Sequence, residues 1–248
     1  MVIISAGDSV TAKLVQEAGF DGIWVSGFEV SARMGLPDNG SLTMTEMVNV
    51  CKPIVNAVKL PVYVDVDTGY GNFKRTVKEF ENIGVAGICV EDNLPDKQNS
   101  LWGGKCELMS MEEFGNKINI LHKLKIIART EALIRGYGAV ETMKRLFHYA
   151  ECGADFLLPH SRTTPIGLDI KVCDFYKWAI VPTKFPHYTN KQLYGMGYSM
   201  VIWANQTERV KIKSIREALR ILKEDDCAVN IENKLSATLD DMKGLVND

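Results

Sequence analysis

Apolar and polar positions along the chain show two alternating patterns. Short β-branched runs alternate with longer stretches in which apolar residues recur every three or four positions. This order is typical of βα units built around a parallel sheet. The predicted strands are 2–5, 22–26, 62–67, 87–91, 125–129, 156–160, 179–182 and 200–204. The predicted helices, expected to form an outer ring, include 9–18, 43–58, 74–83, 111–121, 139–152 and 207–223.

About eight strands in alternation with helices is the number that closes a (β/α)₈ TIM barrel, and a chain of 248 residues is a typical length for one. At 46% hydrophobic residues the chain can bury one large core. We find no linker, low-complexity tract or internal repeat beyond the βα rhythm. The sequence therefore predicts a single barrel domain over residues 1–248.

Charge and targeting signals narrow the function classes. The 29 basic and 31 acidic residues are interspersed and give a net charge of −2, so neither nucleic acid nor an anionic membrane is the expected partner. The net charge does not exclude a small anionic substrate, since local arginines decide whether one can bind. The sequence contains no apolar run long enough for a membrane span and no secretory signal, which predicts a soluble cytoplasmic protein. The six scattered cysteines are expected to be reduced thiols, without disulfides or zinc.

Polar side chains follow nearly every predicted strand. In a TIM barrel the carboxyl ends of the strands carry the catalytic groups, so these endings are the candidate site. A single polar residue at such a position is more often a hydrogen-bonded rim residue than a catalyst, but a full set is harder to explain that way. The endings are 24–27, 65–67, 91–92, 129–131, 160–162, 183–184 and 205.

Two carboxylates at the end of the third strand suggest a metal site. Side chains alternate along a strand, so Asp65 and Asp67 are expected on one face and Val64 and Val66 on the other. Paired carboxylates suit Mg²⁺ or Mn²⁺. The plain alternative is a strand end with two solvated acids, but the acidic ending 91–92 of the next strand favours the metal.

The segment 93–105 is longer than an ordinary βα loop and is predicted to be a lid. It offers Lys97, Asn99 and Ser100 as donors to an anion, Trp102 as an anchor, and a Gly-Gly pair at 103–104 as a hinge. The alternative is a solvated polar loop.

Several long motifs resemble one enzyme superfamily. They are Asp65-Val-Asp-Thr-Gly-Tyr-Gly-Asn-Phe73, Val90-Glu-Asp92, Lys97-Gln-Asn-Ser100, Ile127-Ala-Arg129, Val181-Pro-Thr-Lys184 and Ser199-Met-Val-Ile-Trp-Ala-Asn205. Together they are similar to the isocitrate lyase and phosphoenolpyruvate mutase superfamily, and within it to the mutase branch, over nearly the whole chain. The resemblance implies a barrel that interconverts phosphoenolpyruvate and 3-phosphonopyruvate with Mg²⁺, as the first step of phosphonate biosynthesis.

The resemblance also implies a role for each matched residue. Asp65 would ligate Mg²⁺ directly, while Asp67, Glu91 and Asp38 would hold its waters. The substrate would be bound by Trp24, Ser26, Gly27, Phe28 and Glu131. The phosphoryl group would be held by Arg129 and His160, with Lys97, Asn99 and Ser100 from the lid. Asp38 would lie near the transferring group, and the resemblance does not decide between a nucleophile and an orienting group, of which we favour the orienting group.

Four alternatives stay open. Carbon–carbon lyases of the superfamily carry a cysteine in the lid where this chain has Asn99, which argues against them but not against a decarboxylase. Phosphonopyruvate hydrolases usually carry threonine there, so Asn99 favours the mutase. The last alternative is a barrel without catalysis of its own, which only binds an anion or serves as a subunit of another enzyme.

Two positions differ from the family's usual residues, and the C-terminal segment is similar to the family. Two residues differ from its usual pattern, because Asn93 replaces a lysine and Val25 a glycine. The segment 228–246 is similar to a helical region that relatives exchange between subunits, which implies a homodimer or homotetramer.

Overall fold

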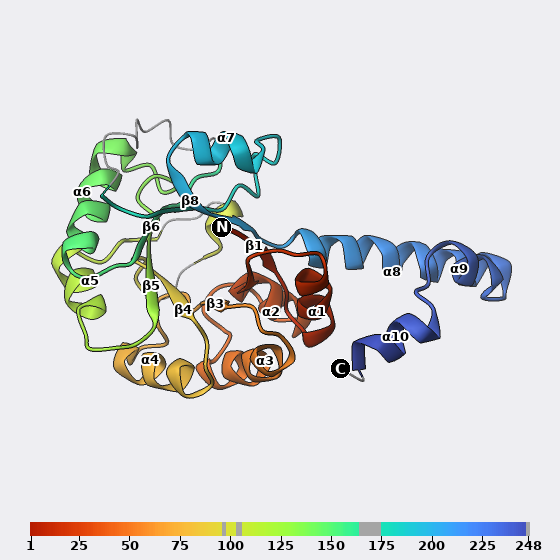
Figure 1. Cartoon of the computed structure of the whole chain (residues 1–248). Coiled ribbons are helices and arrows are strands. Elements are labelled where there is room, and N and C mark those ends of the chain that lie inside the picture. The colour runs from red at the N-terminus through yellow and green to blue at the C-terminus, as the bar shows by residue number, and fades with distance from the viewer. Residues whose placement is uncertain (96–97, 103–105, 164–174, 247–248) are drawn as a thin grey trace. The chain divides into compact units, whose positions relative to one another are not determined.

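The computed structural model describes residues 1–95, 98–102, 106–163 and 175–246. Eight parallel strands close into a barrel in the order β1 to β8, and helices surround it (Figure 1). The predicted (β/α)₈ TIM barrel is confirmed. The strands are β1 Val2–Ser5, β2 Gly22–Val25, β3 Val62–Asp65, β4 Gly87–Glu91, β5 Lys125–Thr130, β6 Phe156–Pro159, β7 Trp178–Ile180 and β8 Tyr198–Trp203.

The helices of the barrel unit include five of the six predicted ones and several short ones that the apolar pattern did not indicate. They are α1 Ser9–Glu17, α2 Gly27–Arg33, α3 Met44–Ala57, α4 Phe73–Asn82, η1 Ser100–Trp102, α5 Met111–Ile118, α6 Gly138–Glu151 and α7 Asn190–Gly195. The sixth predicted helix, expected over 207–223 as part of the outer ring, belongs to a second compact unit of the chain and not to the barrel unit. The elements α2, η1 and α7 were not predicted. They have 7, 3 and 6 residues, which is too short to display a helical period. Capping boxes start α3 and α5 at Thr43 and Ser110.

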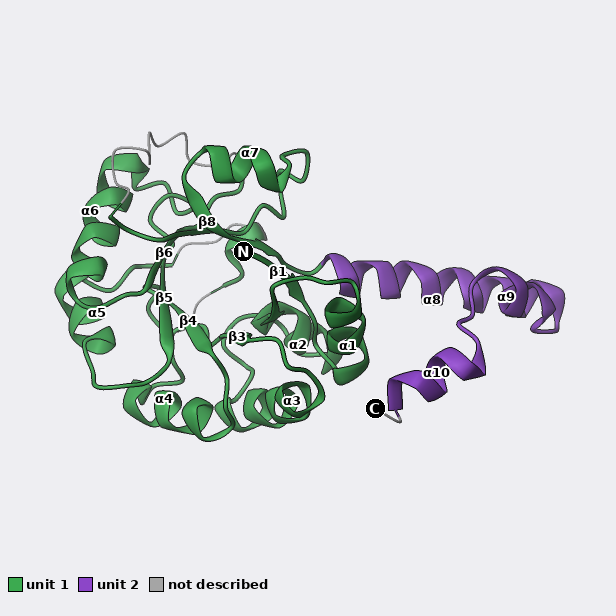
Figure 2. Cartoon of the chain, viewed as in Figure 1, with its two compact units in different colours: residues 1–205 green, residues 206–248 purple. Residues whose placement is uncertain are grey.

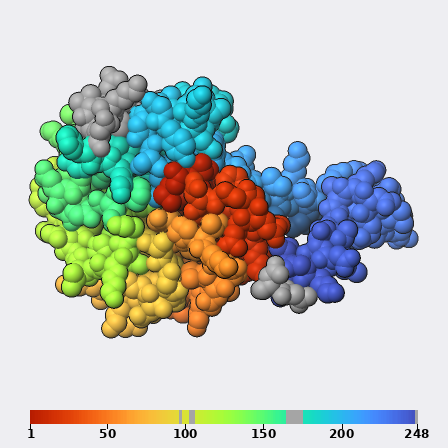
Figure 3. Space-filling view, viewed as in Figure 1, coloured from red at the N-terminus to blue at the C-terminus, as the bar shows by residue number. Residues whose placement is uncertain are grey.

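Strand alternation divides the core into two layers. One buried cluster includes Trp24, Tyr63 and Ile127 and fills the barrel, while the other includes Val64 and Val90 between strands and helices. Atoms accordingly fill the ring that the ribbons outline in Figure 1 (Figure 3).

The turn after β3 corrects one boundary. The strand ends at Asp65, two residues earlier than predicted, and Asp67 lies in a turn with φ of +50°. Gly69 has φ of +90°, and a Cβ there would lie 2.7 Å from the Phe73 ring, so the turn requires glycine. Lys117 of α5 donates a hydrogen bond to the Thr68 carbonyl at 3.1 Å and fixes the turn from outside.

The described chain forms two compact units, Met1–Asn205 and Gln206–Asp248 (Figure 2). The first holds the barrel. The second consists of α8 Gln206–Asp225, α9 Val229–Lys234 and α10 Leu239–Val246. No helix in the described part of the chain has the length and apolar character needed to cross a membrane.

Candidate active site

One cavity at the carboxyl ends of the strands collects most of the predicted site residues. Those that line it are Trp24, Ser26, Phe28, Asp38, Asp65, Asp67, Glu91, Asn99, Ser100, Arg129 and His160. Gly27 lies directly beside Asp67, since a Cβ at Gly27 would lie 3.3 Å from the Asp67 Oδ1. Glu131 does not line the cavity but lies behind it, fully buried. Lys97 and the predicted glycine hinge lie outside the described residues.

The Arg129 guanidinium is the centre of the charged contacts. Its Nε lies 2.5 Å from the Glu131 Oε1, its Nη2 3.1 Å from the Glu91 Oε2, and its Nη1 3.5 Å from the Asp65 Oδ2. Burial acts to lower the pKa of Arg129, but these carboxylates raise it well above its usual value. The arginine is therefore a permanent cation held in a fixed orientation.

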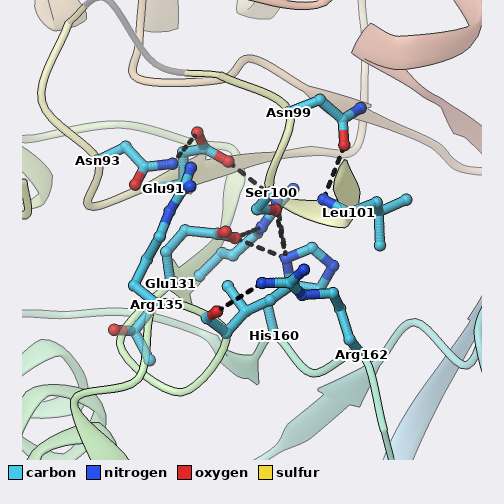
Figure 4. Close-up of polar contacts among 12 residues, drawn as sticks. Glu91, Asn93, Asn99, Ser100, Leu101, Glu131, Arg135, His160 and Arg162 are labelled. Carbon is cyan, nitrogen blue, oxygen red and sulfur yellow. Dashed lines mark hydrogen bonds and ion pairs between the residues drawn. The ribbon is translucent and has the colours of Figure 1, made fainter. Parts of the chain in front are cut away.

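Glu131 orients His160. The His160 Nδ1 lies 2.7 Å from the Glu131 Oε1 and 3.3 Å from the Ser100 Oγ (Figure 4). The same nitrogen lies 3.0 Å from the Arg129 Nη2. Since the carboxylate can only accept, we assign the proton to Nδ1, which donates to Glu131. Burial and then Arg129 lower the pKa of His160, so the imidazole is neutral near pH 7.

The pKa of Glu131 responds to the same groups. Burial would raise it, but the charge of Arg129 and the hydrogen bonds from His160 and Arg129 hold it well below its usual value. Glu131 is therefore an ionised carboxylate that fixes Arg129 and His160, two side chains that line the cavity, while it does not line the cavity itself as the predicted substrate contact would require.

The described part of the loop after β4 closes over the cavity through Asn99. Its Nδ2 donates to the Asp38 Oδ2 at 2.5 Å, and its Oδ1 accepts the Leu101 N–H at 2.8 Å. Arg135, which follows β5, holds the loop from outside, since its Nη2 donates to the Gln98 carbonyl at 2.8 Å. Arg162, which follows β6, donates from its Nη2 to the Ile134 carbonyl at 3.1 Å and so joins the segments after β5 and β6 (Figure 4). Asn99 thus joins the loop to Asp38 on the other side of the cavity.

Asn93 is a cavity residue whose role the sequence did not reveal. It is almost fully buried, and its Nδ2 donates to the Glu91 Oε1 at 2.7 Å (Figure 4). The sequence marked it only as a departure from the family. A polar residue directly after an acidic strand end was the available signal.

The two acids at the end of β4 face opposite sides of the strand. Glu91 faces the cavity, whereas Asp92 is fully buried on the outer side and faces α6. Burial raises the pKa of Asp92, and hydrogen bonds from Glu131 N, Thr130 and Tyr149 offset part of that rise. Asp92 is a structural carboxylate that cannot contact a ligand in the cavity.

The donors in the cavity fit a divalent cation. Among the described residues that line it, four carboxylates (Asp38, Asp65, Asp67 and Glu91) face two cationic side chains (Arg129 and Lys184). Buried carboxylates in excess favour a hard cation such as Mg²⁺. No three His, Cys, Asp or Glu side chains of the described residues are grouped closely enough to form a ligand set.

Comparison with known proteins identifies the family. The profile of the phosphoenolpyruvate phosphomutase family matches residues 1–223. The chain belongs to the phosphoenolpyruvate phosphomutase family. Among family relatives, phosphoenolpyruvate phosphomutase of Tetrahymena pyriformis is 35% identical, over 94% of this chain and 83% of its own. Phosphonopyruvate hydrolase of Variovorax sp. (strain Pal2) is 34% identical, over 90% and 82%.

A solved structure supports the same family. Phosphoenolpyruvate phosphomutase from Streptomyces platensis subsp. rosaceus superposes with a TM-score of 0.91 at 35% identity, over 99% of this chain and 90% of that one. Lyases of the phosphomutase superfamily match as well. The resemblance inferred from the motifs is confirmed, and so is the prediction that the chain is an enzyme.

Proposed function

We propose that the protein interconverts phosphoenolpyruvate and 3-phosphonopyruvate by Mg²⁺-dependent transfer of the phosphoryl group within one substrate molecule. The observation that carries the proposal is the chemistry of the loop over the cavity. Its described lining residues are Gln98, Asn99, Ser100 and Leu101. None of these side chains can protonate a carbanion, which a carbon–carbon lyase requires, but Asn99 and Ser100 can donate hydrogen bonds to phosphoryl oxygens.

The cavity residues divide the work by charge. Arg129 and neutral His160 bind the phosphoryl oxygens, and the guanidinium plane suits them better than an ammonium would. Trp24 walls the pocket, while Ser26, Gly27 and Phe28 bind the substrate carboxylate. Asp65 would hold Mg²⁺ directly, with Asp67, Glu91 and Asp38 holding its waters, and the bound ion would supply positive charge that stabilises the enolate. Phosphoryl transfer depends mainly on such positioning and electrostatics.

Exclusion of water favours transfer over hydrolysis. Asn99 and Ser100 are 9% and 4% exposed, so the loop shields the position where the phosphoryl group would detach. Asp38 is held by Asn99, which supports a role as an orienting group rather than a nucleophile. Lys97 would add charge to the loop.

The test is ³¹P NMR of the purified protein with phosphonopyruvate and Mg²⁺, repeated with EDTA and with Asp65→Ala. We expect a phosphoenolpyruvate signal that disappears in both controls. Inorganic phosphate as the product would instead make the protein a phosphonopyruvate hydrolase. An unchanged phosphonopyruvate signal would exclude both and direct assays to 2-oxo acids, as substrates of a lyase or decarboxylase.

The proposed setting is the cytoplasm, at the first step of phosphonate biosynthesis, and the proposed assembly is a homodimer or homotetramer. Apolar side chains of the second unit, such as Ile215, Leu219, Leu239 and Met242, are more than half exposed within the single chain. A second copy, through exchange of the C-terminal helices, is the occupant proposed for them. Sedimentation velocity tests this, and a monomer at micromolar concentration would contradict it.

A further inference from the structure

A second charged cluster lies outside the cavity and has no role in the proposed chemistry. This Asp92 cluster consists of Asp92, Thr130, Arg145 and Tyr149. The Asp92 Oδ2 lies 3.2 Å from the Arg145 Nη1 and accepts the Tyr149 hydroxyl at 2.8 Å and the Thr130 hydroxyl at 2.7 Å. Asp92 is fully buried and Arg145 is 7% exposed.

Stability alone is a weak reason for such a pair. Moving two charges out of water costs several kcal/mol per ion, and a well-packed apolar pair is often as stable or more so. Arg145 lies on the buried face of α6, beside Thr142 and Leu146, where an apolar residue would fit the helical pattern. A role in holding neighbouring backbone in place would explain the Asp92 cluster better than stability.

The cluster holds the ends of two strands that carry site residues. The Asp92 Oδ1 accepts the backbone N–H of Glu131 at 2.9 Å, and the Asp92 N–H donates to the Arg129 carbonyl at 3.2 Å. The Asp92 carbonyl accepts the Met109 N–H at 2.8 Å, and the Arg145 Nη1 donates to the Met109 carbonyl at 2.7 Å. Asp92 is also the direct neighbour of Glu91.

We propose that Asp92 and Arg145 are positioning residues, which set the carboxyl ends of β4 and β5 so that Glu91, Arg129 and Glu131 meet in the cavity with the spacing that the cation and the phosphoryl group require. This inference rests on the proposed function. The side chains of the cluster reach the substrate only through the backbone, so they contribute to geometry and not to contact.

The same strand offers a matched control at its other end. The Asp155 Oδ2 accepts the backbone N–H of Ile126 at 2.9 Å, and the Asp155 Oδ1 lies 2.7 Å from the Lys125 Nζ. A carboxylate thus binds the β5 backbone and pairs with a cation at the amino end as well. This second pair lies away from the cavity.

The experiment compares Asp92→Asn with Asp155→Asn in the full-length protein. Mg²⁺ affinity is measured by calorimetry, kcat and KM by the interconversion assay, and backbone protection at 129–132 by hydrogen exchange. We expect Asp92→Asn to weaken Mg²⁺ binding or lower kcat by about 10- to 100-fold, the usual effect of losing a group that orients a ligand. KM should change less than kcat, and protection at 129–132 should fall. Asp155→Asn should leave Mg²⁺ affinity, kcat and that protection unchanged.

Two results would overturn the proposal. One is wild-type Mg²⁺ affinity, kcat and protection in Asp92→Asn. The other is an equal loss in both variants, which would make the effect one of general stability. If Asp92→Asn does not fold, Tyr149→Phe removes one hydroxyl from the cluster and must give a smaller loss in the same direction.

Failure of the proposed function is distinguishable from failure of this inference. If the wild-type protein neither binds Mg²⁺ nor interconverts the two acids, the proposed function fails. The exchange measurement then decides the inference by itself, because protection at 129–132 depends only on the backbone. Unchanged protection in Asp92→Asn would refute it.

Discussion

The two ends of β5 use the same kind of contact for different purposes. At the amino end, Asp155 binds the Ile126 N–H and pairs with Lys125, whose side chain is 55% exposed. At the carboxyl end, Asp92 binds the Glu131 N–H and pairs with Arg145, which is almost fully buried. Water screens the first pair and reaches the second hardly at all, so only the second is costly to form.

The difference between the exposed and the buried pair shows that the costly buried charges of this barrel lie at the carboxyl ends of its strands. Carboxylates lie around Arg129 at the carboxyl ends of the strands, while the interior of the barrel is filled by side chains such as Tyr63 and Ile127. Excess negative charge in a buried cavity is tolerable when a cation completes it. We therefore expect substitutions at the carboxyl ends to affect function, and those at the amino ends to affect only stability.

The largest expected effect is that of Asp65→Ala. Loss of the one carboxylate proposed to ligate the cation directly should lower kcat by at least about 100-fold. The free energy of unfolding should change by less than about 1 kcal/mol, or about 2 to 4 °C in melting temperature, because one of several like charges is removed. Enzyme assay and calorimetry of the same preparation test this. A large drop in melting temperature would make Asp65 a structural residue and weaken the comparison.

Asn99→Ala should have an intermediate effect. It removes the contact to Asp38 at 2.5 Å and the cap on the Leu101 N–H, so the loop loses its attachment across the cavity. We expect kcat to fall by about 10-fold or more and KM to rise less, as for a contact made mainly in the transition state. Steady-state kinetics decides the point, and an unchanged kcat would remove Asn99 from the mechanism.

Lys125→Met should have the smallest effect, and it tests the amino end of β5 against the carboxyl end. Exposed ion pairs contribute about 0 to 1 kcal/mol, and the methionine keeps most of the apolar contact of the lysine chain. We expect a small shift in the denaturation midpoint and an unchanged kcat. A loss of activity comparable to that of Asn99→Ala would mean that the amino end of β5 also controls the site.

The sequence predicted the barrel and its strands well because β-branched runs and strand-end polarity are local signals. Strand alternation could also have shown that Asp92 faces away from Glu91, since Cys89 and Glu91 share the inner face. The partners of Asp92 could not be predicted, because Arg145 and Tyr149 lie 53 and 57 residues further along the chain. An arginine on the buried face of α6 was the available clue.

The site was predicted less completely than the fold. Glu131 was expected to contact the substrate, yet its side chain lies behind the cavity against Arg129 and His160. Which side chain faces the ligand and which supports it depends on rotamers and on packing between strands. Neither is encoded in the local spacing of polar residues.

The pairing of β1 with β8 also constrains how the molecule is made. Val2 is in register with Val201, and the terminal amine donates to the Ser199 carbonyl, 198 residues away. On the ribosome the first strand is therefore synthesised long before its second neighbour exists, and one side of it stays unpaired until the eighth strand emerges. Barrel closure depends on contacts of the highest sequence separation in the chain, which makes it slow. During that interval the unpaired edge of the first strand exposes backbone N–H and C=O groups that can pair with another strand.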